Sequence, residues 1–338
     1  MTVIIIIIAI ALLFDFVNGM NDAANSISTV VSTRVLSPRW AVIWAAFFNF
    51  IAFLFFGLHV ATTIGKGVVD PGAINTVVIT SGLIGAIIWS ALMTYGGMPI
   101  SVSHALVGGL LGAAITHAGF DVLILGGVLK IAVFIFVAPI LGLIGGFIFM
   151  SIVRLLFRNS SPSKVNTPFR RLQLLSAAAY SLGHGGNDAQ KTMGIIAILL
   201  FTWKSKIALE TGLPPPKFEV ALWVVLACHA AMGLGTLLGG WHVIKTMGQK
   251  ITHLQPVGGF CAETAGAVML FISTFLGIPV STTHTITGSI IGVGATRRLS
   301  AVRWGVAINV VWAWILTIPF SAAVAALSYL ILKNLMTP

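Results

Sequence analysis

Two related motifs place amide and acidic side chains inside long apolar segments. GMNDAA at 19–24 is followed by Asn25, and the related GGNDAQ occurs at 185–190. A carboxylate inside a bilayer is costly and usually faces a partner or an ion pathway. Carboxylate and amide oxygens are also the ligands that hard cations prefer. The pattern therefore predicts a site for a cation or a proton, with five candidate residues: Asn21, Asp22, Asn25, Asn187 and Asp188.

Glycines accompany both acidic motifs. Gly19 precedes the first Asn-Asp pair, and Gly183, Gly185 and Gly186 precede the second. Because glycine tolerates backbone conformations that end a helix, we expect each helix to break there and to free backbone carbonyls. These carbonyls would add to the oxygen ligands of the predicted cation site.

A second pair of motifs combines proline, hydroxyl residues and histidine. PISVSH occurs at 99–104 and PVSTTH at 279–284. Proline disfavours helix in the residue before it, so each hydroxyl run is expected at the N-terminus of a short helix. Free backbone N–H groups, hydroxyls and the positive end of the helix favour an anion there. The pattern predicts a site for a tetrahedral oxyanion, with these candidates: Ser101, Val102, Ser103, Ser281, Thr282 and Thr283.

Five further polar residues lie near these motifs and are candidate helpers: His104, His284, Lys191, Gln190 and Glu263. Purely structural roles stay open for the histidines, for Lys191 and for Glu263. Lys191 breaks the symmetry, because it follows Asp188 by three residues where Asn25 follows Asp22. At that helical spacing Lys191 can pair with Asp188 and supply a built-in cation, which favours proton over sodium coupling. No zinc-type motif is present, so Na⁺ is the only metal expected and Na⁺ or H⁺ replaces any cofactor.

The elements that hold these motifs are predicted to be membrane helices. The 338 residues are 57% hydrophobic and 8% charged, whereas a soluble domain carries roughly a quarter charged residues. Most of the apolar segments have the length of about 20 residues that a membrane helix needs. They lie near 2–33, 39–58, 76–95, 104–118, 122–157, 169–201, 219–243, 258–277, 284–296 and 304–333. We therefore expect an all-α polytopic protein of the plasma (inner) membrane.

The net charge of +11 is explained by the orientation of the chain in a membrane and not by nucleic-acid binding. The basic residues cluster in short loops, where the positive-inside rule and anionic headgroups explain them. The loops around Arg34, Arg158, Lys245 and Arg297 are therefore expected on the cytoplasmic side. The lipid bilayer is an expected partner and nucleic acid is not.

The repeated motifs keep their order, which indicates an internal duplication. Residues 1–157 form the first predicted repeat, 158–168 a cytoplasmic linker and 169–338 the second repeat. Five crossings in each half satisfy the charge pattern and place both termini outside. The halves then have opposite orientations, which is typical of secondary transporters. The stretches 96–103 and 276–283 are open to being turns or re-entrant hairpins.

The four motifs together resemble those of the inorganic phosphate transporter (PiT) family over nearly the whole chain. The form NDAQKTMGII at 187–196 is more similar to bacterial low-affinity phosphate permeases, usually proton-linked, than to the animal sodium-dependent branch. The resemblance implies an inverted-topology repeat with broken helices, two re-entrant hairpin-like half-helices and a homodimer. It places phosphate on the hydroxyl candidates and the cation on the Asn-Asp candidates. Lys191 stands where the symmetric fifth cation ligand would be.

The predicted function is a secondary active transporter that imports inorganic phosphate with H⁺ or Na⁺ by alternating access. Phosphate is the expected substrate, free or as a metal–phosphate complex. Sulfate symport on the same fold is an alternative, since both anions are tetrahedral. A membrane-embedded lipid phosphatase is a distant alternative that would need a nucleophile, a general base and usually an arginine at the phosphate. All arginines here lie in or beside loops, so we do not expect an enzyme.

Overall fold

The computed structural model describes residues 2–336, and its regular elements are helices. The long helices are α1 (Thr2–Ser32), α4 (Thr76–Tyr95), α6 (Leu125–Leu156), α7 (Pro162–Thr211), α10 (Pro256–Phe275) and α12 (Trp304–Met336). The shorter helices are α2 (Pro38–Ile51), α3 (His59–Lys66), α5 (Val102–Ala118), α8 (Leu222–Leu238), α9 (Trp241–Lys245) and α11 (Thr282–Ala295). The predicted all-α class is confirmed.

The helix lengths separate membrane spans from shorter elements. Six of the described helices are long and apolar enough to cross a membrane, or seven if α8 and the bent segment after it form one span. Helix α5 has 17 residues and α11 has 14. At 1.5 Å per residue they reach about 25 and 21 Å, short of the roughly 30 Å hydrocarbon core. These lengths favour half-helices, while re-entry into the bilayer and five crossings per half stay predictions.

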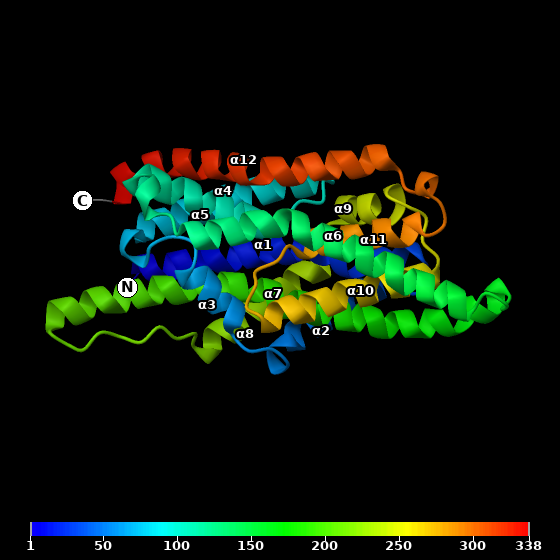
Figure 1. Ribbon diagram of the computed structural model, residues 1–338. Helices are drawn as coiled ribbons and strands as arrows, with labels where there is room; N and C mark the ends of the chain where they lie inside the picture. The colour runs from blue at the N-terminus through cyan, green and yellow to red at the C-terminus, as the bar shows by residue number, and fades with distance from the viewer. Residues whose placement is uncertain (1, 337–338) are drawn as a thin grey trace.

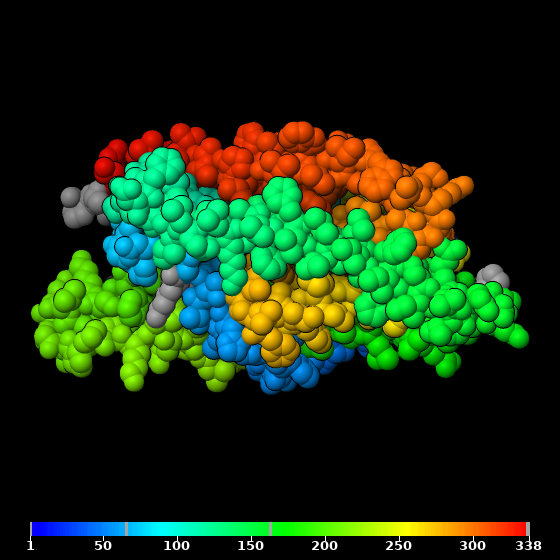
Figure 2. All heavy atoms as spheres, viewed as in Figure 1, coloured from blue at the N-terminus to red at the C-terminus, as the bar shows by residue number. Residues whose placement is uncertain are grey.

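The outer helices present apolar side chains to their surroundings. In the space-filling view, α6 crosses the face between α12 and α10 (Figure 2). Its side chains Phe136, Ile140 and Ile144 are exposed. A soluble protein rarely exposes so continuous an apolar face, whereas a lipid-facing helix requires it. The arrangement is that of an integral membrane protein.

The two halves of the chain contain matching helices that run in opposite directions. The chain colours in Figure 1 show α1 antiparallel to α7, and α6 antiparallel to α12. Helix α5 packs against α4 and α12, and α11 packs against the corresponding α10 and α6. This arrangement favours the predicted inverted repeat. The orientation of each half in a bilayer, the division into 1–157 and 169–338, and the homodimer stay predictions.

The expected helix breaks at the acidic motifs are wrong. Helices α1 and α7 continue without interruption through Asp22 and Asp188. The glycines instead allow close packing of neighbouring backbones. A Cβ atom on Gly19 would lie 2.2 Å from the carbonyl oxygen of Met232, and one on Gly185 would lie 2.4 Å from that of Asn49. Glycine lets these carbonyls approach where any side chain would collide.

A helix does break at a different glycine pair, Gly239 and Gly240. Helix α8 ends before Gly239, whose φ of +66° favours glycine. The helical segment that follows, through Lys250, is bent by 65° relative to α8. The break therefore lies in a neighbouring helix and directly beside the first acidic motif, since a Cβ atom on Gly240 would lie 2.7 Å from the carbonyl oxygen of Met20.

Most of the predicted linker is helical. Helix α7 begins at Pro162, inside the predicted linker 158–168, because Ser161 has the extended backbone of an N-cap and proline suits the first helical turn. The non-helical connection between α6 and α7 is therefore confined to 157–161, and the bounds of the cytoplasmic linker stay a prediction.

The basic loops meet at one end of the molecule. The Arg170 side chain donates to the carbonyl oxygen of Arg34 at 2.6 Å, and Arg154 donates to that of Thr296. Helix α7 runs from this end to the opposite end (Figure 1), where Val3 and Leu335 line one cavity. The beginning of α1 and the end of α12 thus lie together, opposite the arginine-rich loops.

Candidate functional site

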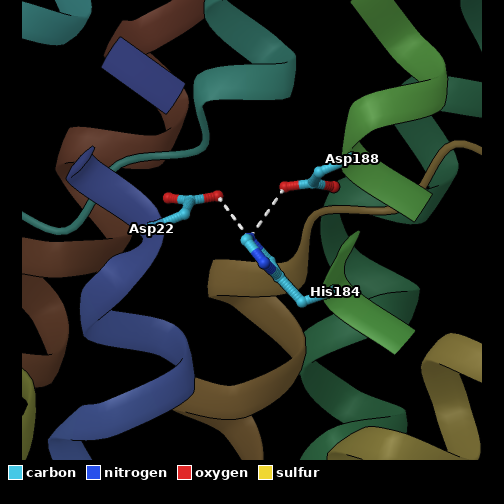
Figure 3. A group of neighbouring side chains, drawn as sticks. All are labelled: Asp22, His184 and Asp188. Carbon is cyan, nitrogen blue, oxygen red and sulfur yellow. Dashed lines mark ion pairs between the residues drawn. The ribbon is translucent and has the colours of Figure 1, made fainter. Parts of the chain in front are cut away.

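The two acidic motifs face each other at the centre of the fold. Asp22 on α1 and Asp188 on α7 point toward His184, which lies one turn before Asp188 (Figure 3). The His184 Nε2 atom lies 3.6 Å from Asp22 Oδ2 and 3.4 Å from Asp188 Oδ2. All three side chains are buried. One ligand atom from each residue lies within 4.8 Å of the others, a grouping able to hold a metal ion.

The N-terminus of α11 closes this centre from one side. Ser281 caps the helix and its hydroxyl accepts from the His284 backbone N–H at 3.2 Å. The Thr282 hydroxyl lies 3.2 Å from Asp22 Oδ2 and 3.1 Å from Asp188 Oδ2, so one residue joins the two carboxylates. The Thr283 hydroxyl donates to Asp22 Oδ1 at 3.3 Å. The predicted anion-site and cation-site residues are therefore in direct contact.

The asparagines of the acidic motifs make matching contacts in the two halves. The Asn21 amide donates to Thr94 at 2.5 Å, and the Asn187 amide donates to Thr274 at 3.0 Å. Thr94 and Thr274 are the second-last residues of the corresponding helices α4 and α10. In both asparagines the amide oxygen is buried without a hydrogen-bond partner. Unpartnered buried oxygens of this kind are suited to a cation.

Asn25 connects the first acidic motif to α11. Its amide donates to Thr283 at 2.9 Å and to Thr282 at 3.3 Å. Because the NH₂ group is used in this way, the Asn25 amide oxygen is left without a partner in a buried position. Asn25 thus offers an oxygen on the same helix as Asp22.

Lys191 joins the centre by pairing with Asp188, as its spacing predicts. Its ammonium group also donates to the hydroxyl of Ser103, at the start of α5, and to the carbonyl oxygen of Val280 at 2.7 Å. The side chain is only 2% exposed. The Lys191 side chain therefore does not extend to the membrane surface.

The N-terminus of α5 approaches from the other side. Ser101 caps α5 as Ser281 caps α11, and Val102 is buried beside it. The following histidines meet across the centre, with the ring centroids of His104 and His284 4.8 Å apart. His284 also stacks on Trp314. The two hydroxyl motifs are thus brought together as expected.

Two candidate helpers lie outside this centre. Gln190 accepts from the backbone N–H groups of Val60 and Ala61 at the start of α3, at 3.0 and 3.3 Å. Glu263 accepts from Gln173 at 2.9 Å and from Ser176 at 2.5 Å, forming a separate buried cluster between α7 and α10. Both side chains support helix contacts and touch none of the central carboxylates.

His184 is the central residue that the sequence prediction left out. Its position four residues before Asp188 places both on one helix face, but only the structure shows that Asp22 reaches the same ring. The other ring nitrogen, Nδ1, lies 3.0 Å from Asn49 Oδ1 on α2. Asp15 is a second buried acid near the centre and accepts from Thr192 at 2.9 Å.

Long lipid-facing helices around a closed polar centre define a polytopic membrane transporter. The chain belongs to the phosphate transporter family, whose sequence model matches residues 18–164 and 157–325. This confirms the resemblance carried by the four motifs. The relatives are transporters, so enzymatic activity is not expected.

Individual relatives cover almost the whole chain. A probable low-affinity inorganic phosphate transporter of Rhizobium meliloti is 57% identical over 323 residues, which are 96% of this chain and 94% of that protein. A protein of Bacillus subtilis with the same description is 45% identical over 335 residues, 98% of this chain and 97% of its own. The solved structure of a protein described as the sodium-dependent phosphate transporter matches with a TM-score of 0.89 and 28% identity, covering 99% of this chain and 100% of that one.

Proposed function

We propose that this protein imports inorganic phosphate across the plasma membrane by symport with H⁺ or Na⁺. The observation that carries the proposal is the contact of Thr282, at the anion-type N-terminus of α11, with both Asp22 and Asp188. An anion held at this helix end would lie next to two carboxylates. The cation site and the anion site would therefore lie in direct contact, and binding at one would influence binding at the other.

Electrostatics explains how this contact would couple the two solutes. Phosphate is repelled by Asp22 and Asp188 when both carry a charge, and the repulsion is strong in a buried site. A bound proton or sodium ion at the carboxylates removes part of that repulsion. Binding of each solute then raises the affinity for the other, and it does so by the same factor in both directions. A symporter requires this mutual dependence.

The two related halves supply a route for alternating access. Each half contributes one acidic helix and one short helix to the centre, and antiparallel repeats of this kind open to opposite sides in turn. The Asp22–His184–Asp188 group also has the ligand types of a divalent-ion site. Uptake of a metal–phosphate complex therefore belongs to the proposed substrate range.

The test is labelled phosphate uptake into proteoliposomes with Na⁺ and pH gradients imposed separately. We expect uptake under at least one gradient, and weak competition by excess sulfate. Sulfate cannot donate a hydrogen bond to Asp22 or Asp188 near neutral pH, whereas phosphate can. Full competition by sulfate would favour a sulfate carrier instead.

Asp22→Asn and Asp188→Asn should each reduce uptake by at least about tenfold, because each removes a buried carboxylate that Thr282 contacts at the centre. Asp121→Asn is the matched control, since Asp121 is an exposed acid. Normal uptake by both central variants would contradict the assignment of the coupling site.

A further inference from the structure

The two halves of the centre differ at one charged position. Asn25 follows Asp22 by three residues and Lys191 follows Asp188 by three residues. The corresponding helices α1 and α7 bring both positions to the same buried centre. One half therefore carries a neutral amide where the other carries a permanent ammonium group.

All three hydrogens of the Lys191 ammonium group are used in contacts that hold the side chain in place. They are directed to Asp188, to the Ser103 hydroxyl and to the Val280 carbonyl oxygen. An ammonium group has three donors and no acceptor, so the three contacts use its full capacity. Carboxylate, hydroxyl and carbonyl oxygens are also the ligands of a bound hard cation. The Lys191 nitrogen thus occupies an oxygen cage of the kind a metal ion would occupy.

The first half offers oxygens without a resident lysine ammonium group. The amide oxygens of Asn21 and Asn25 are both buried and without a hydrogen-bond partner, while their NH₂ groups are bound to threonine hydroxyls. Both lie on α1 within four residues and flank Asp22. Among the described residues, no lysine or arginine forms an ion pair with Asp22.

We propose that Lys191 is a resident cation that replaces one of two symmetry-related coupling ions. The mobile cation then binds only in the first half, at Asp22 with Asn21 and Asn25. The inference rests on the proposed symport and deepens it, because it sets the number of coupling ions. The protein should move one fewer cation per phosphate than a variant that carries asparagine at both positions.

The experiment restores the symmetry with Lys191→Asn, which copies Asn25 onto the second half. Equilibrium binding of radioactive Na⁺ to the purified protein, without phosphate, should show one more Na⁺ per chain in this variant than in the unaltered protein. Phosphate uptake should depend more steeply on the coupling cation, with a Hill coefficient that rises by about one. Reversal potentials in proteoliposomes should show one additional positive charge moved per phosphate.

Two further variants control the result. Lys204→Asn removes an exposed lysine from the same helix and should leave Na⁺ binding and the Hill coefficient as they are. Asn25→Lys places a second ammonium group beside Asp22 and should abolish Na⁺ binding in the first half. Size-exclusion chromatography and thermal unfolding show which variants are folded.

A folded Lys191→Asn protein that neither binds an additional Na⁺ nor moves an additional positive charge per phosphate would overturn the proposal. Two mobile coupling cations bound to the unaltered protein would also overturn it, and that measurement does not depend on any variant folding. The proposed function fails separately, if the unaltered protein takes up no phosphate under either gradient.

Discussion

At the scale of single residues, the polar centre is asymmetric although its motifs are repeated. Thr282 on α11 corresponds to Val102 on α5, so only α11 has a hydroxyl that touches both Asp22 and Asp188. On the α5 side the corresponding link is made by Lys191 through Ser103. The two short helices therefore approach the carboxylates with different chemistry, one through hydroxyls and the other through an ammonium group.

Thr282→Val should separate the bridging role of the hydroxyl from the shape of the side chain. Valine is close in size to threonine and is the residue that α5 carries at the matching position. Hydrogen bonds to charged groups contribute about 1.5–3 kcal/mol, so we expect phosphate uptake at low substrate concentration to fall by roughly ten- to a hundredfold. Thr282→Ser keeps the hydroxyl and should retain most of the uptake. Equal loss in both variants would indicate that packing of the Thr282 methyl group, and not its hydroxyl, supports uptake.

The sequence predicts which residues gather at the centre better than it predicts their partners. Asp22 and Asp188 could be identified because a carboxylate in an apolar segment is costly, whatever it touches. The contact of His184 with Asp22 joins two helices and has no local signature. Gln190 belongs to the second acidic motif and Glu263 lies in an apolar segment, yet their hydrogen-bond partners lie on α3 and α7 and not at the centre. Pairing between helices is a tertiary property that spacing within one helix does not determine.

At the scale of secondary structure, repeated glycines hold the short helices against the long ones. A Cβ atom on Gly108 would lie 2.5 Å from the carbonyl oxygen of Ile318 on α12. The corresponding atom on Gly288 would lie 2.1 Å from that of Pro139 on α6. Small residues allow this backbone approach in membrane helices, where apolar burial alone does not drive association. The same device therefore fixes α5 and α11 in the two halves.

Gly292→Ala should displace α11 from α6. The added Cβ would lie 2.1 Å from the carbonyl oxygen of Leu143. This collision is relieved only if the backbone of α11 or α6 moves. Overpacking costs about 1–3 kcal/mol, so we expect a lower apparent melting temperature and reduced phosphate uptake. Gly305→Ala is the control, because nothing lies within 4 Å of the added atom. An unchanged melting temperature in Gly292→Ala would mean that the helix contact is looser than the structure indicates.

Close packing at glycines also explains why the helix breaks predicted at the acidic motifs are absent. Glycine permits a break but does not require one, and Gly19 and Gly185 are instead covered by carbonyl groups of neighbouring helices. The sequence signal for a break and for a close contact is identical. Gly239, where α8 does end, differs by its positive φ, which only the structure reveals.

At the scale of the whole molecule, the long helices have two different ends. One end carries the arginine-rich loops, and the other carries the beginning of α1 and the end of α12. Helix α7 has 50 residues and therefore extends about 75 Å, more than twice the roughly 30 Å of the hydrocarbon core. It begins at the arginine-rich end and finishes near the beginning of α1 and the end of α12 (Figure 1). Because basic loops are retained in the cytoplasm, the arginine-rich end should face the cytoplasm and both termini the outside.

Single-cysteine labelling tests this orientation, and the chain is suited to it because both native cysteines, Cys228 and Cys261, are buried. Cysteine in place of Ser160 lies at the arginine-rich end, and cysteine in place of Thr211 lies at the opposite end; both positions are exposed. In right-side-out membrane vesicles, a membrane-impermeant maleimide should label Thr211→Cys at once and Ser160→Cys only after permeabilisation. Inside-out vesicles should give the reverse order, which controls for differences in intrinsic reactivity. Labelling of Ser160→Cys alone in right-side-out vesicles would mean that the protein is inserted the other way round, so that phosphate would enter the centre from the arginine-rich face.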